Sequence, residues 1–200
     1  MSRYRGPRLR ITRRLGELPG LVRKSSGKQN PPGQHGATPK KPSQYSLRLQ
    51  EKQKLRFHYG LNERQLVNLV KRARRFQGST GDRLLQLLEL RLDTIIFRSG
   101  FAPTLRASRQ LVSHGHVKVN NSTVNIPSFQ CKPGDMFQVK KLKPVEESIQ
   151  SGSASSLVAA NHLESDQKNF TSTLKQQIGR TEVSCPINEF LVIEYYSRKV

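Results

Sequence analysis

Residues 104–126 read TLRASRQLVSHGHVKVNNSTVNI, and the spacing of apolar residues changes within this stretch. In its first half apolar residues recur at helical intervals behind Thr104, a residue type that favours the N-cap position. From Val117 onward apolar and polar residues alternate on both sides of Asn120-Asn121, which is typical of a β-hairpin. The sequence therefore predicts a short helix that is followed directly by the first strands of a small antiparallel sheet.

After this hairpin the sequence predicts a further strand, a stretch without periodicity and an apolar run of undecided structure. Residues 133–135, Pro-Gly-Asp, predict a turn that leads into a strand over residues 136–140. Residues 146–181 lose periodicity and are rich in Ser, Gln and Asn, so we interpret them as a surface excursion or variable insertion. The apolar run 190–196 has the β-propensity of a strand, whereas Asn188 before it favours a short helix, and the sequence does not decide between the two.

Helices are predicted upstream of the quoted stretch. The first covers residues 45–59 behind Ser43 as N-cap. Asn62 and Gln65 have the spacing of a capping box and open a second helix. A third helix holds the densest apolar stripe of the chain, which we assign to the core: Leu84, Leu85, Leu88, Leu92, Ile95 and Ile96.

The charge of the chain is strongly positive and unevenly distributed. Its 35 Lys and Arg against 14 Asp and Glu give a formal net charge of +21. Residues 1–82 carry +16, residues 83–145 carry +7 and residues 146–200 carry −2. Such an excess needs a polyanion, and nucleic acid fits because contacted phosphates release condensed counterions. A membrane is the rival polyanion, but no apolar run reaches the roughly 18 residues that a span requires.

The first forty-two residues are predicted to be an extended basic arm with little core, ordered only on RNA; a solvated tail is the alternative. The acid-poor start has the arginine content of an organellar transit peptide but only one serine before Arg14, so we favour a mature arm. His35 has no companion acid or nucleophile, which favours base stacking or a phosphate contact over catalysis. The candidate RNA-binding residues of the arm are Arg3, Tyr4, Arg5, Arg10, Arg13, Arg14, Gln34 and His35.

Metal and cofactor chemistry is not expected. Cys131 and Cys185 have no partners at metal-ligand spacing. His114 and His116 are two residues apart without a third ligand nearby. We therefore predict neither metal nor cofactor.

Several motifs in residues 91–140 carry a resemblance: RLD (91–93), RSGFA (98–102), SRQLVSH (108–114), VN (119–120) and PGD (133–135). They resemble the small RNA-binding module first named from ribosomal protein four. The same module is appended to some pseudouridine synthases, tyrosyl-tRNA synthetases and a heat-shock RNA-binding protein. Alone, the module implies binding to structured RNA.

The flanking motifs are similar to the family of small-subunit ribosomal protein four: RYRGP (3–7), PGQHG (32–36), EKQKLR (51–56), YG (59–60), GSTG (78–81) and INEFLVIEYYS (187–197). Plastid members of that family are matched most closely, through RLGELPGL (14–21), LRFHYGL (55–61) and CKP (131–133). Two features depart from some relatives. Residues 24–30 hold none of the zinc-binding cysteines found there in some bacteria, and Ser122 follows Asn120-Asn121 where Asn-Gly and a basic residue are usual.

The resemblance implies an α+β fold with four parts. Residues 1–42 form the extended basic arm, and residues 43–87 form a helical domain that residues 186–200 complete. Inserted into it is a small RNA-binding domain, residues 88–145, in which a helix-turn-helix packs on an antiparallel sheet. Residues 146–185 form the variable insertion.

The resemblance also implies function. The protein would be a structural constituent of the small ribosomal subunit, a primary binder of 16S-type rRNA that nucleates assembly of the subunit body. With ribosomal proteins five and twelve it would influence translational accuracy. Its partners would be rRNA, protein five and other small-subunit proteins, with no membrane and no small-molecule substrate. It would be no enzyme and would act in the plastid (chloroplast) stroma, in the ribosome. The rivals are an RNA-modifying enzyme with this module and a free regulatory RNA binder.

Candidate RNA contacts outside the arm lie on the predicted helices and the hairpin. For Thr104 we favour a structural cap, and for Tyr59 core packing is an equal alternative. Arg91 and Asp93 are as readily an internal ion pair as RNA ligands. The candidates are Lys52, Lys54, Arg56, Tyr59, Arg72, Arg74, Arg75, Thr104, Arg106, Ser108, Arg109, Ser113, His114 and Lys118.

Overall fold

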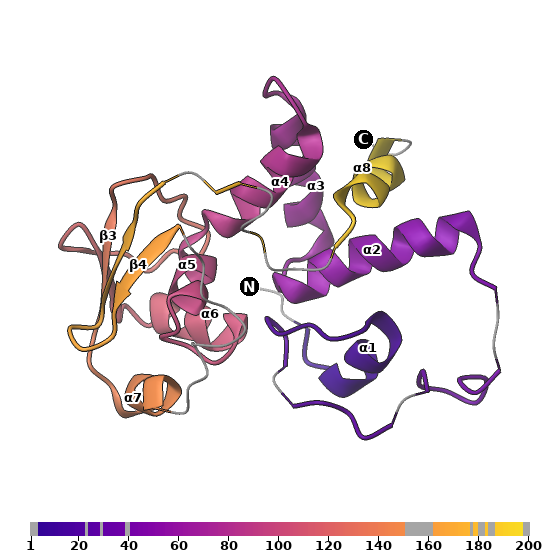
Figure 1. Ribbon diagram of the computed structural model, residues 1–200, viewed down its shortest axis with the longest axis horizontal. Helices are drawn as coiled ribbons and strands as arrows, with labels where there is room; N and C mark the ends of the chain where they lie inside the picture. Colours follow the sequence, from indigo (N-terminus) through magenta and orange to yellow (C-terminus); the bar gives the residue numbers. More distant parts are fainter. Residues whose placement is uncertain are drawn as a thin grey trace. The chain divides into compact units, whose positions relative to one another are not determined.

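The chain contains helices and one antiparallel sheet, so the expected α+β class is confirmed (Figure 1). It divides into two compact units, residues 1–84 with 185–200 and residues 85–184. Arg3, Cys185 and part of the expected insertion lie outside the described residues. The computed structural model describes residues 4–22, 24–28, 30–38, 41–150, 162–176, 178–179, 183 and 187–197.

The first unit is helical, and its helix starts follow the predicted caps. The Ser43 side chain accepts a hydrogen bond from the backbone N–H of Ser46 at 3.2 Å. Asn62 and Gln65 form both bonds of a capping box, at 2.9 and 3.1 Å. The helices of this unit are α1 (Arg8–Leu15), α2 (Gln44–His58), α3 (Glu63–Arg74), the first half of α4 (Thr80–Glu89) and α8 (Glu189–Ser197).

The C-terminal apolar run is a helix. The side-chain oxygen of Asn188 accepts hydrogen bonds from the backbone N–H groups of Phe190 and Leu191, at 3.1 and 3.4 Å, and so acts as the N-cap of α8. Figure 1 shows α8 beside α2 and α3, and it packs against both. Its inward residues Val192 and Tyr196 are buried. Packing between helices therefore overrides the β-propensity of the run.

The basic arm is not extended throughout, which corrects the prediction from composition. Arg and Leu are good helix formers, and residues 8–15 form α1. The helix ends at Gly16, which has a positive φ of 91°. Beyond it, Leu18 and Leu21 are buried, so this part of the arm contributes to the core of its unit.

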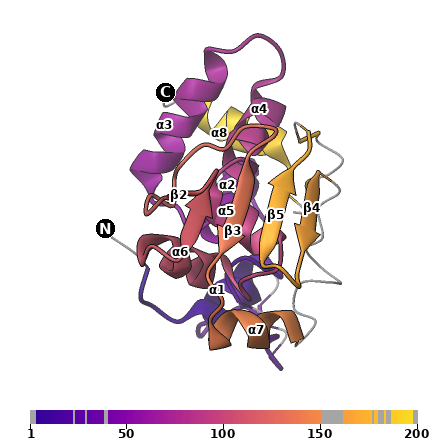
Figure 2. The same ribbon diagram turned by 90° about the vertical axis from the view of Figure 1, so that its left-hand side faces the viewer.

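The second unit is a five-stranded antiparallel sheet with helices packed on it (Figure 2). The strand order is β2-β1-β3-β5-β4, and in the central pair Val117 lies opposite Val139. The core contains Leu92, Ile95, Val112 and Phe137, all fully buried. The elements are α5 (Leu92–Arg98), α6 (Leu105–Ser113), β1 (Val117–Val119), β2 (Ser122–Thr123), β3 (Met136–Val139), α7 (Lys143–Gln150), β4 (Leu163–Asp166) and β5 (Thr171–Leu174).

The predicted third helix is two helices, α4 and α5. Between them Arg91 is extended, with φ −74° and ψ 141°. It forms an antiparallel bridge with Gln130, and the backbone N–H of Cys131 donates to the carbonyl of Leu90 at 2.9 Å. These long-range bonds replace the helical ones at this point, and the spacing of apolar residues cannot reveal them.

The hairpin is confirmed, but its second strand is shorter than predicted. Asn120 and Asn121 have φ of 46° and 67°, the left-handed conformation that a two-residue hairpin turn needs. β2 includes only Ser122 and Thr123, and Ile126 is 55% exposed rather than on the sheet. Its alternation with polar residues was therefore no sign of a strand.

The sheet also extends into residues 146–181, where the sequence predicts a surface excursion or variable insertion. β5 pairs with β3 in the middle of the sheet. Its inward residue Ser172 is buried and shares a hydrogen bond of 2.9 Å with the Ser99 hydroxyl. A serine at an inward strand position removes the apolar alternation by which a strand is recognised.

Candidate nucleic-acid interface

Asp93 lies at the centre of a cluster of ion pairs in the second unit. Its buried carboxylate accepts bidentate hydrogen bonds from Arg91, at 3.0 and 2.8 Å, so the internal ion pair is confirmed. The guanidinium of Arg109 on α6 donates to the same carboxylate at 2.9 and 2.6 Å. The Ser108 hydroxyl donates to the Asp93 carbonyl. Two cations thus compensate one buried anion, and α6 is fixed to α5.

Four of the candidate RNA-contact residues have structural roles in the fold. Tyr59 is 1% exposed and Ser108 is fully buried, so neither side chain reaches solvent. Lys52 is buried as well, with its Nζ 2.9 Å from Glu63. The Thr104 hydroxyl caps α6 by accepting from the N–H of Ala107 at 3.3 Å. Sequence patterns identify polar residues on a helix, but they do not tell the outer face from one that covers a neighbouring helix.

The accessible candidates of the second unit lie near both ends of α6 and on β1. Ser113 and His114 are exposed, and Arg106 and Lys118 are partly exposed. The Ser113 hydroxyl donates to the carbonyl of Arg109 at 2.8 Å, which leaves its lone pairs available to a ligand. Together they provide two cations, a hydroxyl and an imidazole on adjacent elements.

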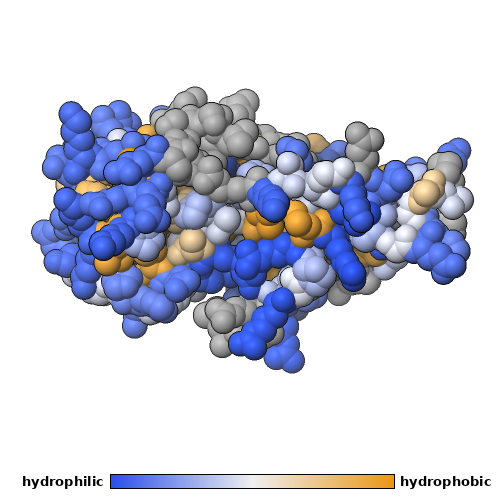
Figure 3. Space-filling model, turned by 90° about the horizontal axis from the view of Figure 1, so that it is seen from below, coloured by the Kyte–Doolittle hydropathy of each residue, from blue (hydrophilic) through white to orange (hydrophobic). Residues whose placement is uncertain are grey.

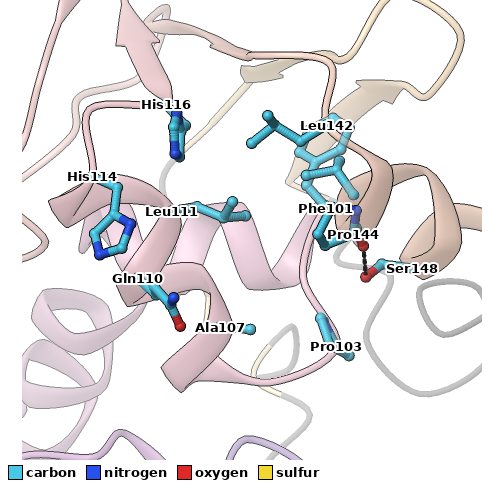
Figure 4. A pocket seen from close by; sticks show the side chains of 11 residues that line it. Phe101, Pro103, Ala107, Gln110, Leu111, His114, His116, Leu142, Pro144 and Ser148 are labelled. Carbon is cyan, nitrogen blue, oxygen red and sulfur yellow. Dashed lines mark hydrogen bonds between the residues drawn. The ribbon is translucent and has the colours of Figure 1, made fainter.

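A pocket of about 330 Å³ adjoins this surface between α6 and α7 (Figure 4). His114, His116 and Gln110 lie on one side, and Leu142 and Pro144 lie on the other. The two imidazole rings meet edge to face, with centroids 6.0 Å apart. The lining contains no Lys, Arg, Asp or Glu.

The densest exposed charge of the first unit lies at the end of α3. Arg72, Arg74 and Arg75 are exposed, together with Lys71. Cations in this position complement the negative end of the helix dipole, and their exposure makes them accessible to phosphates. Phe76 directly follows them and is also exposed, although it is not among the predicted candidates. The signal was an aromatic between two arginines and a glycine break.

The candidates on α2 are half-buried and engaged within the helix. Lys54 Nζ lies 2.5 Å from Glu51 Oε1. The guanidinium of Arg56 donates to Gln53 at 3.3 Å and lies 5.2 Å from the Phe57 ring centroid. These are weaker candidates than the end of α3, because a phosphate would compete with bonds already formed.

The described candidates of the arm are mostly exposed: Tyr4, Arg5, Arg10, Arg14, Gln34 and His35. Tyr4 packs edge-on against Phe57, with centroids 5.4 Å apart. Arg13 is engaged within the arm, donating to the carbonyls of Asn30 and Pro31 at 2.9 and 3.4 Å. Figure 3 shows one face of the molecule, on which hydrophilic side chains cover most of the described surface.

Other kinds of site find little support. Among the described residues, no group of three His, Cys, Asp or Glu side chains could hold a metal ion. None of the helices in the described part of the chain is long and apolar enough to cross a bilayer. Cys131 is buried, and this desolvation, aided by the charges of Asp135 and Asp93, raises the pKa of its thiol. The thiol is therefore unreactive.

Exposed cations on helices, a basic arm and a small sheet domain define an RNA-binding protein. The comparisons with known proteins agree. Two family models match the chain. The model described as "Ribosomal protein S4/S9 N-terminal domain" matches residues 3–89, and the model described as "S4 domain" matches residues 90–137.

Relatives match along the whole chain. It is 53% identical over 202 residues to small ribosomal subunit protein uS4c of Nephroselmis olivacea, and 54% over 201 residues to that of Porphyra purpurea. It is 55% identical over 203 residues to small ribosomal subunit protein uS4 of Prochlorococcus marinus subsp. pastoris. Each match covers 100% of both chains. The chain therefore belongs to the uS4 family, structural constituents of the small ribosomal subunit rather than enzymes.

Proposed function

We propose that this chain is a primary binder of 16S-type small-subunit rRNA and nucleates assembly of the subunit body. The exposed cations at the end of α3 carry the proposal, because four basic residues within five positions need a polyanion. α6 and the arm supply further accessible cations. Phosphate contacts would fix the position of the protein, and RNA shape rather than base sequence would dominate recognition.

The RNA-contact set is the accessible part of the candidates. In the second unit it includes Arg106, Ser113, His114 and Lys118, with Arg109 in a mixed role because its guanidinium also binds Asp93. Lys54 and Arg56 would join by giving up bonds within α2. The remaining members of the set lie in the first unit: Tyr4, Arg5, Arg10, Arg13, Arg14, Gln34, His35, Arg72, Arg74 and Arg75.

Protein partners would use the less basic part of the chain. Residues 146–200 carry a net charge of −2, so rRNA has little attraction for them. Ribosomal protein five is the proposed neighbour, and with protein twelve this contact would influence translational accuracy. The similarity to algal uS4c proteins supports a chloroplast ribosome, hence the stroma, as the place of action.

Three experiments test the proposal. In low-magnesium sucrose gradients of a chloroplast extract, the protein should co-migrate quantitatively with the small subunit; a largely free pool would support a regulatory RNA binder. In stepwise reconstitution, the chain should bind naked five-prime-domain rRNA before other proteins are added. A requirement for prior binding of another protein would exclude a primary role. Pseudouridine formation by the pure protein would favour the enzyme alternative.

A further inference from the structure

Phe76 forms an aromatic surface that the core does not use. It follows α3, and its backbone N–H donates to the carbonyl of Ala73 at 3.3 Å, which fixes the residue against the helix end. Its side chain is 40% exposed. Arg83 on α4 places its guanidinium carbon 4.2 Å from the ring centroid, a cation–π contact. An exposed ring is therefore held in a defined position by a cation.

The surroundings of the ring are strongly cationic. Lys71, Arg72, Arg74 and Arg75 precede it and are exposed, and Arg75 donates its backbone N–H to the carbonyl of Arg72 in the last turn at 3.2 Å. Asp82 is the acidic residue close by in sequence, and its backbone N–H donates to the Ser79 hydroxyl at 3.4 Å. A ligand of this surface must carry negative charge and also offer something flat and apolar to the ring.

We propose that Phe76 and Arg83 form a stacking platform for an unpaired nucleobase, while the neighbouring cations bind the phosphates on either side of it. The inference rests on the proposed rRNA binding and adds a specific contact to it. Bases splayed from RNA helices stack on aromatic rings and guanidinium planes. A nucleotide unites a planar π-face with a negative charge, whereas the carboxylates of an acidic protein segment offer charge to the cations but no π-face to the Phe76 ring.

The test uses the full chain and a transcript of the five-prime domain of small-subunit rRNA, with the dissociation constant measured from 50 to 300 mM KCl. Phe76→Leu keeps an apolar side chain and removes the ring. Because stacking on an aromatic is worth about a 5- to 100-fold change in affinity, this variant should bind that much more weakly. The dependence on salt should not change, since no charge is lost.

Three further variants sharpen the result. Phe76→Tyr restores the ring and should bind within about threefold of wild type, because the π-face is what stacking needs. Phe190→Leu is the matched control, a 71% exposed phenylalanine on the acidic C-terminal helix α8, and should leave RNA affinity unchanged. Arg72→Ala should instead reduce the slope of log affinity against log salt by about one phosphate contact. Circular dichroism melts show that each variant is folded.

The outcomes separate the platform from the broader proposal. If the wild-type chain does not bind the transcript, both fail. If it binds and Phe76→Leu binds within twofold of it, rRNA binding stands and the platform is wrong. A loss in Phe76→Leu that Phe76→Tyr does not restore, or that comes with a changed salt slope, also contradicts stacking. Normal RNA affinity with impaired uptake into small subunits would point to a protein contact at Phe76 and would overturn the base platform.

Discussion

Arg106 and Arg109 lie one turn apart on α6, but their structural environments differ. Both are cationic and both follow the same cap, so the sequence presents them as one pair of RNA ligands. The guanidinium of Arg109 is 2.6 Å from the buried carboxylate of Asp93, and Arg106 is partly exposed near the start of the same helix. A phosphate would therefore compete with the buried Asp93 carboxylate for Arg109.

Substitution of each arginine by alanine should affect stability and RNA affinity differently. Arg109→Ala should lower the free energy of unfolding by about 2 kcal/mol, because a buried carboxylate loses charged hydrogen bonds. Arg106→Ala should cost less stability than Arg109→Ala, because Arg106 is partly exposed, and it should reduce the salt slope of rRNA affinity by about one. Urea denaturation and filter binding over a salt series measure both quantities. The distinction fails if Arg106→Ala is the less stable of the two, or if only Arg109→Ala alters the salt slope.

At the scale of single elements, Glu63 at the start of α3 links three helices. It accepts a hydrogen bond from Tyr196 of α8 at 2.7 Å and pairs with Lys52 of α2 at 2.9 Å. Burial alone would raise the pKa of Glu63, but the hydrogen bonds from Lys52 and Tyr196 outweigh it and hold the pKa below its ordinary value. The folded state therefore prefers the charged carboxylate.

Stability should follow the charge of Glu63. A lowered pKa contributes stability that is present above the unfolded-state pKa, about 4.3, and is lost as pH falls through the folded value. Melting temperatures measured from pH 6 to pH 3 should therefore decline less steeply in Glu63→Gln than in wild type. Glu164→Gln, at an exposed pair with Lys175, is the control and should keep the wild-type slope. Parallel profiles for all three proteins would mean that Glu63 contributes nothing.

The turn of the hairpin supplies a second prediction at this scale. Asn121 has φ of 67°, a conformation that costs most residues about 1 kcal/mol or more and glycine nothing. Asn121→Ala should therefore destabilise the protein by about that amount, and Asn121→Gly should leave it equal or slightly more stable. Chemical denaturation of the two variants decides. Equal losses in both would mean that the Asn121 side chain, rather than the backbone angle, holds the turn.

The elements also show how far sequence patterns carry. Caps and turns are local, so Ser43, Asn62, Thr104 and the Asn120-Asn121 turn could be placed from the sequence alone. The break at Arg91 and the inward Ser172 depend on partners about forty and seventy residues away, and no local pattern contains them. The same limit applies to the site: charge located the α3 end, but burial of Tyr59 and Lys52 is a property of packing.

For the whole molecule, the net charge of +21 acts in opposite directions on folding and on RNA binding. Without RNA, like charges repel one another in the compact state, and salt screens that repulsion. With RNA, salt weakens binding because it reduces the gain from counterion release. Raising KCl from 50 to 300 mM should thus raise the melting temperature of the free protein by a few degrees while lowering its affinity for the rRNA transcript by at least about a hundredfold.

Sucrose is the control, since it stabilises folded proteins by exclusion and screens no charge, and it should raise the melting temperature without the loss of affinity. A melting temperature that falls with KCl would show that attractive ion pairs such as Arg48–Glu194 and Lys52–Glu63 outweigh the repulsion. The excess charge would then be fully compensated within the fold, and RNA would not be needed to neutralise it.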